Sequence, residues 1–272
     1  MVPHLKIDNS NYSRLPGSIN TKIAIIPIPI FLVIIGLLLG LGLKEVFVFS
    51  SPLALLVVSI LFYWLVTPAI TYISAKGYLN TGSLTLLFIS LAFFVALPFS
   101  IVSGAVASMP NLTVMFAAFG FILSSAFQLC GAAQASFGSV SVGFQNRKLR
   151  LTLALMGALI LSLVLVILGF LGIFPSFFLQ NSGITLVDQV VYAAVILFFA
   201  LAGLLYLRLY LKSKSRTLYF YSLALILYAI GSFGITQQVT FGDAVVWVGR
   251  IATYFGLIYF LYALIGSQRQ NS

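Results

Sequence analysis

The sequence predicts an all-α integral membrane protein, built as a single bundle of eight transmembrane helices. Three observations predict it: the composition, the number of long apolar stretches, and the distribution of basic residues between them. The 272 residues are 61% hydrophobic and only 7% charged, with a mean hydropathy of +1.16. Soluble domains carry about 25% charged residues, and a soluble fold this apolar would expose patches that aggregate. Lipid is therefore the expected solvent for most of the surface.

Eight apolar stretches each approach or exceed the ~20 residues that a helix needs to cross ~30 Å of hydrocarbon. They cover residues 23–43, 53–75, 84–107, 112–137, 150–174, 188–211, 217–236 and 244–266. Residues 23–266 are thus expected to form one membrane domain, with an N-terminal tail at 1–22 and a C-terminal tail at 267–272. No length remains for a separate soluble domain between these spans.

Prolines predict where the first spans bend. Pro27 and Pro29 lie near the start of the first stretch, Pro68 lies in the second and Pro98 in the third. Proline removes a backbone donor and kinks a helix, and membrane helices tolerate such kinks when their neighbours satisfy the freed groups. Each of these prolines is therefore interpreted first as structural.

Small and polar residues predict how the spans pack. Gly36 and Gly40 form a G-x-x-x-G pair, a spacing that lets helices approach closely. The fourth span carries a face of polar and small residues at helical spacing. These residues are Ser124, Gln128, Gly131 and Ala135. Packing inside the bundle is one interpretation of this face, and a polar lining for a solute path is the other.

The basic residues predict the orientation, because short loops rich in Lys and Arg face the cytoplasm. Both tails and every second loop are basic, whereas the loops between them are neutral or acidic. The basic positions are Lys6, Arg14, Lys22, Lys76, Arg147, Lys148, Arg150, Arg208, Lys212, Lys214, Arg216 and Arg269. Eight spans with both termini cytoplasmic satisfy this alternation, which predicts a multi-pass protein of the cell membrane.

An internal repeat is one explanation of a similarity between residues 78–92 and 210–224, which lie 132 positions apart. The identical residues include Tyr78, Leu79, Thr85, Leu86, Phe88, Ser90, Leu91 and Ala92 in the first segment. Four spans in each half would make the repeats parallel, with an axis along the membrane normal. Chance similarity between apolar helices is the alternative.

Arg250 is the charged residue placed most clearly inside a predicted span, and a guanidinium there costs a few kcal/mol unless it finds partners. Helical spacing puts Asp243, Trp247, Arg250 and Tyr254 on one stripe. Other polar residues are expected at the same depth on neighbouring spans. The resulting candidate ligand-binding site consists of Arg250, Asp243, Asp188, Gln237, Gln238, Tyr192 and Tyr254. The competing interpretation is a topological anchor, in which Arg250 pairs with Asp243, Asp188 or a lipid phosphate.

The rest of the sequence argues against several classes of protein. A single cysteine, Cys130, and a single histidine, His4, predict no disulfide, no metal site and no haem. We found no catalytic motif, so no cofactor and no enzymatic activity are expected. The basic residues lie at helix ends rather than in runs, so nucleic acid is not an expected partner. Asn111-Leu112-Thr113 fits a glycosylation acceptor in a predicted outer loop.

The last two spans, LYFYSLALILYAIGSFG followed by VVWVGRIATYFGLIYFLYALI, resemble the end of MASE-type membrane-associated sensor domains. That resemblance implies a signal-input function. Because no output module follows, it also implies a partner membrane or cytoplasmic signalling protein on another chain. The expected function is therefore a non-enzymatic signal-input or ligand-binding protein in contact with membrane lipids. The alternatives are a small-solute transporter or channel, and an accessory subunit of a larger membrane complex.

Overall fold

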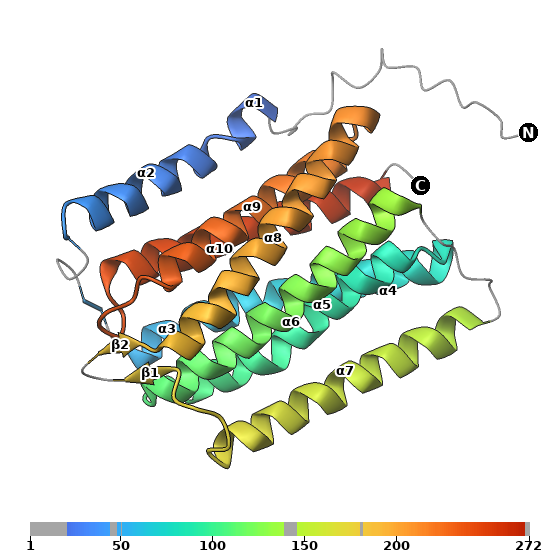
Figure 1. The fold of residues 1–272 in the computed structure, drawn as a ribbon. Helices are drawn as coiled ribbons and strands as arrows, with labels where there is room; N and C mark the ends of the chain where they lie inside the picture. Colours follow the sequence, from blue (N-terminus) through green and yellow to red (C-terminus); the bar gives the residue numbers. More distant parts are fainter. Residues whose placement is uncertain (1–20, 44–47, 50, 139–145, 180–181, 270–272) are drawn as a thin grey trace, which may run out of the picture.

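The computed structural model describes residues 21–43, 48–49, 51–138, 146–179 and 182–269, which form a bundle of helices (Figure 1). In chain order the elements are α1 (Thr21–Ala24), α2 (Pro27–Gly40), α3 (Pro52–Ser59), the π-helix η2 (Ile60–Trp64), α4 (Leu65–Thr81), α5 (Leu84–Ala105), α6 (Pro110–Phe137), α7 (Arg147–Phe170), β1 (Phe178–Leu179), β2 (Gly183–Ile184), α8 (Leu186–Ser213), α9 (Arg216–Ile235) and α10 (Ala244–Arg269). Within these residues, seven helices are long and apolar enough to cross a membrane, with α3, η2 and α4 counted as one. The structure therefore confirms an all-α bundle of apolar helices.

The first predicted span is divided into two helices. α1 ends at Ala24, and α2 begins at Pro27, whose missing N–H suits the first turn of a new helix. At 14 residues, α2 extends only about 21 Å, less than the hydrocarbon core. Its buried side chains, Phe31 and Ile35, face α9 and α10, where the rings of Phe31 and Phe255 lie 5.6 Å apart.

The predicted close approach at Gly36 and Gly40 is not found within the described residues. Both glycines are exposed, and a Cβ added at either would meet no atom within 4 Å. The closest packing lies instead between α9 and α10. A Cβ at Gly249 would lie 2.6 Å from the carbonyl oxygen of Gly231, and one at Gly234 would lie 3.0 Å from the Cα of Gly249. Glycines therefore let these two backbones touch.

Pro68 explains the π-helical segment that interrupts the second span. Pro68 cannot donate to the carbonyl of Trp64, and its ring crowds that carbonyl. The π-helical segment runs from Ile60 to Trp64, so it ends at the residue whose carbonyl Pro68 leaves without a donor. Its wider turn holds one residue more than an α-helical turn. We attribute η2 to this conflict. Tyr63 belongs to this segment, and its side chain lines an internal cavity together with Ser59 and Thr67.

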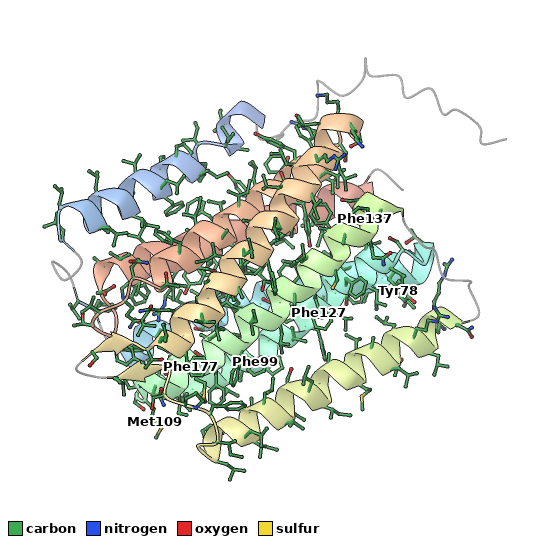
Figure 2. The ribbon with its side chains drawn as sticks, in the orientation of Figure 1. Tyr78, Phe99, Met109, Phe127, Phe137 and Phe177 are labelled. Carbon is green, nitrogen blue, oxygen red and sulfur yellow. The ribbon has the colours of Figure 1, made fainter. Side chains whose placement is uncertain are left out.

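Aromatic side chains fill much of the interior, and some apolar side chains at the ends of helices are exposed (Figure 2). Tyr78 and Phe99 are fully buried, whereas Met109, just before α6, and Phe137, at its end, are exposed. α9 is the most enclosed of the long helices, since most of its residues are buried. α2 and α7 lie at opposite edges of the bundle (Figure 1).

Several loops gather at one end of the bundle, which we call the hairpin end. The strands β1 and β2 pair there antiparallel, with Phe178 opposite Ile184. Gly183 has a φ of +73°, and a Cβ at this position would lie 2.9 Å from the carbonyl oxygens of Gln238 and Val239. A glycine is therefore required for the hairpin to rest on the loop between α9 and α10. Asn111 Oδ1 accepts hydrogen bonds from the backbone N–H groups of Phe177 and Phe178, at 2.8 and 3.0 Å, which ties the chain before β1 to the start of α6.

Two turns at the other end have the same geometry. α4 ends at Gly82, in a left-handed conformation with a φ of 74°, and its N–H donates to Tyr78 O at 2.7 Å. α8 ends at Lys214, also left-handed with a φ of 57°, and its N–H donates to Tyr210 O at 2.7 Å. The next residue is an extended serine in both turns. The paired positions are 132 residues apart, the offset of the sequence similarity.

The packing partners of the helices also occur in matched pairs. α2 packs on α9 and α10, as α7 packs on α5 and α6. α4 packs on α5 and α10, as α8 packs on α9 and α6. We call α3, η2, α4, α5 and α6 the first helix group, and α8, α9 and α10 the second. If the first group and α7 are exchanged with the second group and α2, each of these contacts corresponds to another one in the bundle.

Candidate functional site

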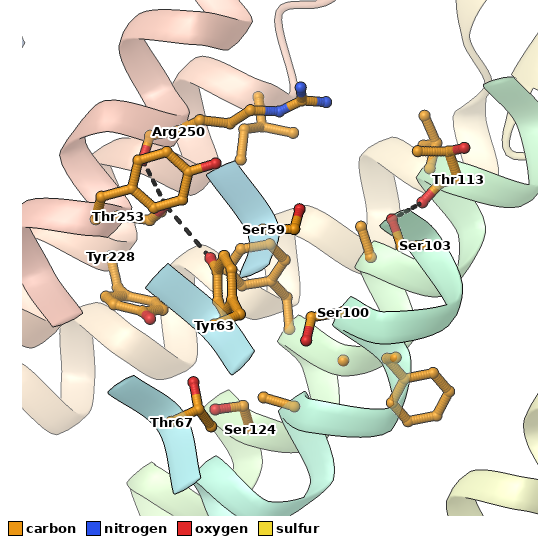
Figure 3. A pocket seen from close by; sticks show the side chains of 18 of the residues that line it. Ser59, Tyr63, Thr67, Ser100, Ser103, Thr113, Ser124, Tyr228, Arg250 and Thr253 are labelled. Carbon is orange, nitrogen blue, oxygen red and sulfur yellow. Dashed lines mark hydrogen bonds between the residues drawn. The ribbon is translucent and has the colours of Figure 1, made fainter. Parts of the chain in front are cut away.

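A cavity of about 90 Å³ lies between the two helix groups. The first group contributes the polar side chains of Ser59, Tyr63, Thr67, Ser103, Thr113 and Ser124. The second group contributes Tyr192, Tyr228, Arg250, Thr253 and Tyr254, and the loop after α9 adds Gln238. Thr67 and Ser124 lie at one end of the cavity, and Arg250, Ser103 and Thr113 lie toward the other (Figure 3). Apolar side chains such as Phe93 and Phe99 complete the wall.

Arg250 is the only charged residue among the described residues that line the cavity. It lies six residues into α10, so about 9 Å along the helix from its start. Its guanidinium stacks on the ring of Trp247, 5.2 Å from the centroid, an attractive cation–π contact. Within the described part of the chain, no hydrogen bond or ion pair engages the guanidinium. Its donors are therefore available to a molecule in the cavity.

Tyr63 connects the η2 side of the cavity to α10, the helix that carries Arg250. Its hydroxyl donates to Thr253 Oγ1 at 3.4 Å, and the Thr253 hydroxyl in turn donates to the carbonyl oxygen of Arg250 at 2.7 Å (Figure 3). Tyr254 stacks on Phe62, with the ring centroids 4.4 Å apart. These contacts join η2 to α10. The π-helical segment thus positions one side of the cavity.

Hydroxyl groups from α5 and α6 form the wall near the hairpin end. Ser103 donates to Thr113 O at 3.0 Å, and Thr113 donates to Val106 O at 2.7 Å. The two helices also approach closely at Gly120, where a Cβ would lie 3.0 Å from the Cβ of Phe99. This wall is therefore tightly built, and both hydroxyls use their protons within the protein.

Four of the seven residues predicted for the site line the cavity: Arg250, Tyr254, Tyr192 and Gln238. The buried Nε2 of Gln238 has no hydrogen-bond partner among the described residues. Gln237 does not line the cavity, and its Nε2 donates to Thr236 Oγ1 at 3.2 Å.

The two predicted carboxylates lie outside the cavity wall. Asp243 is buried just before α10, where its Oδ1 accepts from Val246 N at 3.0 Å and its Oδ2 from Val239 N at 2.9 Å. It therefore caps α10 and closes the preceding loop. Neither it nor Asp188 forms an ion pair with Arg250.

Asp188 lies in the first turn of α8 and is fully buried. Neither of its carboxylate oxygens has a hydrogen-bond partner in the described residues. Thr185 caps the helix by accepting from Asp188 N at 3.5 Å. The start of a helix favours a carboxylate by about 0.3–1 kcal/mol, which is less than the several kcal/mol that burial of a charge costs.

Most of the cavity-lining residues that the first helix group contributes were not predicted from the sequence. Ser59, Tyr63 and Thr67 recur every four residues, and this polar stripe in an apolar span was the available signal. Tyr228 and Thr253 had no comparable signal, because tyrosines and threonines are frequent in these spans. The predicted polar face of the fourth span does reach the cavity, since Ser124 lines it.

No protein family, curated protein or solved structure matches the chain. The resemblance of the last two spans to MASE-type sensor domains therefore stays an expectation. The chemistry of the cavity is what remains to indicate a function.

Proposed function

We propose that this chain is a non-enzymatic multi-pass membrane protein that binds a small organic monocarboxylate in the cavity between its helix groups. The observation that carries the proposal is Arg250, a guanidinium that lines the cavity and forms no ion pair with a described carboxylate. A cation inside a membrane span costs roughly 2.5–3.5 kcal/mol at mid-span. An anionic ligand would offset this cost and use the free donors.

The single charge favours a monovalent carboxylate over a divalent anion. The planar guanidinium binds a carboxylate through two parallel hydrogen bonds, and the resulting pair has no net charge. A phosphate dianion would leave a net negative charge in a low-dielectric site, which is unfavourable. The hydroxyl of Tyr192, which lines the cavity, can donate a further hydrogen bond to an oxygen atom of a ligand.

The cavity volume limits the size of the ligand. A cavity of about 150 Å³ accommodates benzene, which has six heavy atoms, and this cavity measures about 90 Å³. Because the cavity is not fully enclosed, a ligand of roughly four to six heavy atoms, no larger than benzene, is expected. Pyruvate has this size and remains an anion at neutral pH, whereas benzoate is too large.

A thermal-shift experiment on the purified full chain tests the proposal. The protein would be placed in nanodiscs of zwitterionic phosphatidylcholine, and pyruvate, benzoate or phosphate added. We expect pyruvate to raise the unfolding midpoint, since a ligand at 100 times its Kd stabilises by about 2.7 kcal/mol. Arg250→Gln should abolish this rise, whereas Arg208→Gln, on the exposed part of α8, should retain it.

Anionic lipid is the second source of the same chemistry, and a parallel arm distinguishes it. Nanodiscs that contain phosphatidylglycerol would be compared with zwitterionic ones. If the lipid raises the midpoint through Arg250 and pyruvate does not, the ligand is a lipid headgroup. If neither does so, the binding proposal is wrong.

The proposal includes eight spans with both termini cytoplasmic, in a cell membrane whose lipids contact the edge helices. Two observations support α2 as the first span. Its position at one edge of the bundle matches that of α7, and the two helices have corresponding packing partners. The similar turns after α4 and α8 support the four-plus-four parallel repeat in the same way.

Transport is the second candidate function. It is favoured by the place of the cavity, since the substrate sites of repeat-built transporters lie between the repeats near the bilayer midplane. A signal-input role would need the same cavity and a partner on another chain. A transporter would release the ligand on the opposite side of the membrane, whereas a signal-input protein would release it on the side from which it came.

A further inference from the structure

The cavity stops near the middle of the bundle. Ser124 lines its deep end and lies 14 residues after the first residue of α6. At 1.5 Å per residue, this is about 21 Å from the hairpin end. α6 continues for 13 residues beyond Ser124. About half of the bundle therefore separates the cavity from the opposite end.

Aromatic rings close the deep end. The ring of Phe93, which lines the cavity, meets the ring of Phe260 edge to face, with the centroids 5.0 Å apart. Phe260 also contacts Tyr228 at 5.5 Å and Tyr221 at 4.7 Å. Because Phe93 belongs to the first helix group and Phe260 to the second, this closure depends on how the two groups sit against each other.

Buried polar groups continue beyond the rings. One turn after Ser124, Gln128 accepts a 2.7 Å hydrogen bond from the hydroxyl of Tyr221, while its Nε2 has no partner in the described residues. The next turn of α6 carries Gly131, where a Cβ would lie 3.4 Å from the hydroxyl of Tyr206. That buried hydroxyl also lacks a partner among the described residues.

Unpartnered polar atoms are costly in a protein interior, and this set follows one face of α6 from the cavity toward the other end. The face is the one on which Ser124, Gln128 and Gly131 recur at helical spacing. Water or a polar solute would satisfy the free Gln128 and Tyr206 groups if the rings parted. If this face of α6 only packed the core, the unpartnered groups of Gln128 and Tyr206 would lower stability without any benefit.

Resting on the carboxylate site described above, we propose that the protein transports small monocarboxylates. The cavity is one half of the path, and the polar face of α6 is the other. The contact between Phe93 and Phe260 and the hydrogen bond between Tyr221 and Gln128 form the closed gate between them. Both contacts join the first helix group to the second, so a tilt of one group against the other separates them together.

Electrostatics makes exchange the expected mode. The empty site holds a cation without an ion-pair partner in the described part of the chain, whereas the occupied site is neutral, and moving a charge through a low-dielectric region is unfavourable. The occupied protein therefore changes between its two states more readily than the empty one. Substrate on the far side should accelerate release from the near side.

The test uses the full-length protein in phosphatidylcholine liposomes loaded with labelled pyruvate. For the unsubstituted protein we expect saturable efflux that external pyruvate stimulates. Phe260→Ala should keep pyruvate binding in the thermal-shift experiment but convert exchange into a leak that no longer needs external pyruvate. The leak should be roughly three- to tenfold faster, the range that corresponds to the loss of an aromatic pair.

Phe127→Ala is the matched control. Its ring packs on Phe88 at 6.4 Å, a contact between α5 and α6 within the first group, so its loss should leave exchange intact. Binding of pyruvate without efflux above that of protein-free liposomes would overturn the transport proposal and leave the binding proposal standing. Equal leaks in Phe260→Ala and Phe127→Ala would overturn the gate. Absence of binding would overturn both proposals.

Discussion

Gly231 and Gly249 bring the backbones of α9 and α10 into direct contact. A Cβ on Gly249 would lie 2.6 Å from the carbonyl oxygen of Gly231 and 3.0 Å from Ile235 N. Both obstructing atoms belong to the backbone, so no side-chain rotation can make room. Arg250 follows Gly249 directly, and its position at the cavity therefore depends on this contact.

The first prediction concerns this contact. Gly249→Ala should lower the thermal unfolding midpoint in detergent, because overpacking costs about 1–3 kcal/mol and outweighs the roughly 1 kcal/mol that alanine gains over glycine in a helix. Gly36→Ala is the control, since a Cβ there meets open space, and it should leave the midpoint unchanged or raise it. A loss of stability on Gly36→Ala would instead mean that another chain covers this face.

The second prediction concerns the cap of α10. Asp243→Ala removes two hydrogen-bond acceptors for backbone N–H groups and should destabilise the protein by about 1–2 kcal/mol, the upper range for a lost cap. Asp243→Asn keeps one acceptor and should cost less. Asn146→Ala serves as the control, because Asn146 precedes α7 without a side-chain capping bond. Equal losses in Asp243→Ala and Asn146→Ala would contradict the capping role.

The third prediction concerns the buried carboxylate of α8. Asp188→Asn should raise the unfolding midpoint, because a neutral amide of the same shape removes a group whose burial is costly when it has no partner. The favourable interaction with the helix start, about 0.3–1 kcal/mol, is too small to reverse this. Circular dichroism on heating would measure it. A lowered midpoint would mean that Asp188 has a partner outside the described residues or outside the chain.

The fourth prediction concerns topology. Reporters that are active on only one side of the membrane should give the same result when fused to either end of the chain. A reporter placed between α6 and α7 should agree with them, and one placed between α7 and α8 should disagree, as the basic residues predict. Opposite results at the two ends would mean that α2 does not cross the membrane.

The sequence predicted the long helices closely, because a span needs about 20 apolar residues whatever it packs against. The predicted span 84–107 became Leu84–Ala105, and 188–211 became Leu186–Ser213. The first predicted span, 23–43, is divided in the structure, where α2 begins at Pro27, one of the two prolines at which a helix break was predicted. The prediction failed at Gly36 and Gly40, since spacing alone does not say which face of a helix meets a neighbour.

The candidate site was predictable where a residue was chemically unusual. Arg250 was identified because a charge inside a span is rare, and Tyr192 and Tyr254 followed from helical spacing. Asp243 was predicted at the pocket, whereas in the structure it lies outside the cavity wall and caps α10; a carboxylate at a helix start can cap the helix or face a ligand with the same spacing. Tyr63 was missed because the polar stripe of Ser59, Tyr63 and Thr67 was not recognised in an otherwise apolar span.

The π-helical segment also determines which changes in chain length the protein can accept. A π-helical turn contains one residue more than an α-helical turn, so deletion of one residue between Ile60 and Trp64 would restore a regular helix. Because the wider turn accommodates that residue locally, the helix on either side would keep its orientation, and Ser59 and Leu55 would stay at the cavity wall. The same deletion in a regular part of the span would rotate everything before it by about 100° around the helix axis. A single-residue deletion should therefore be accepted more readily between Ile60 and Trp64 than elsewhere in this span.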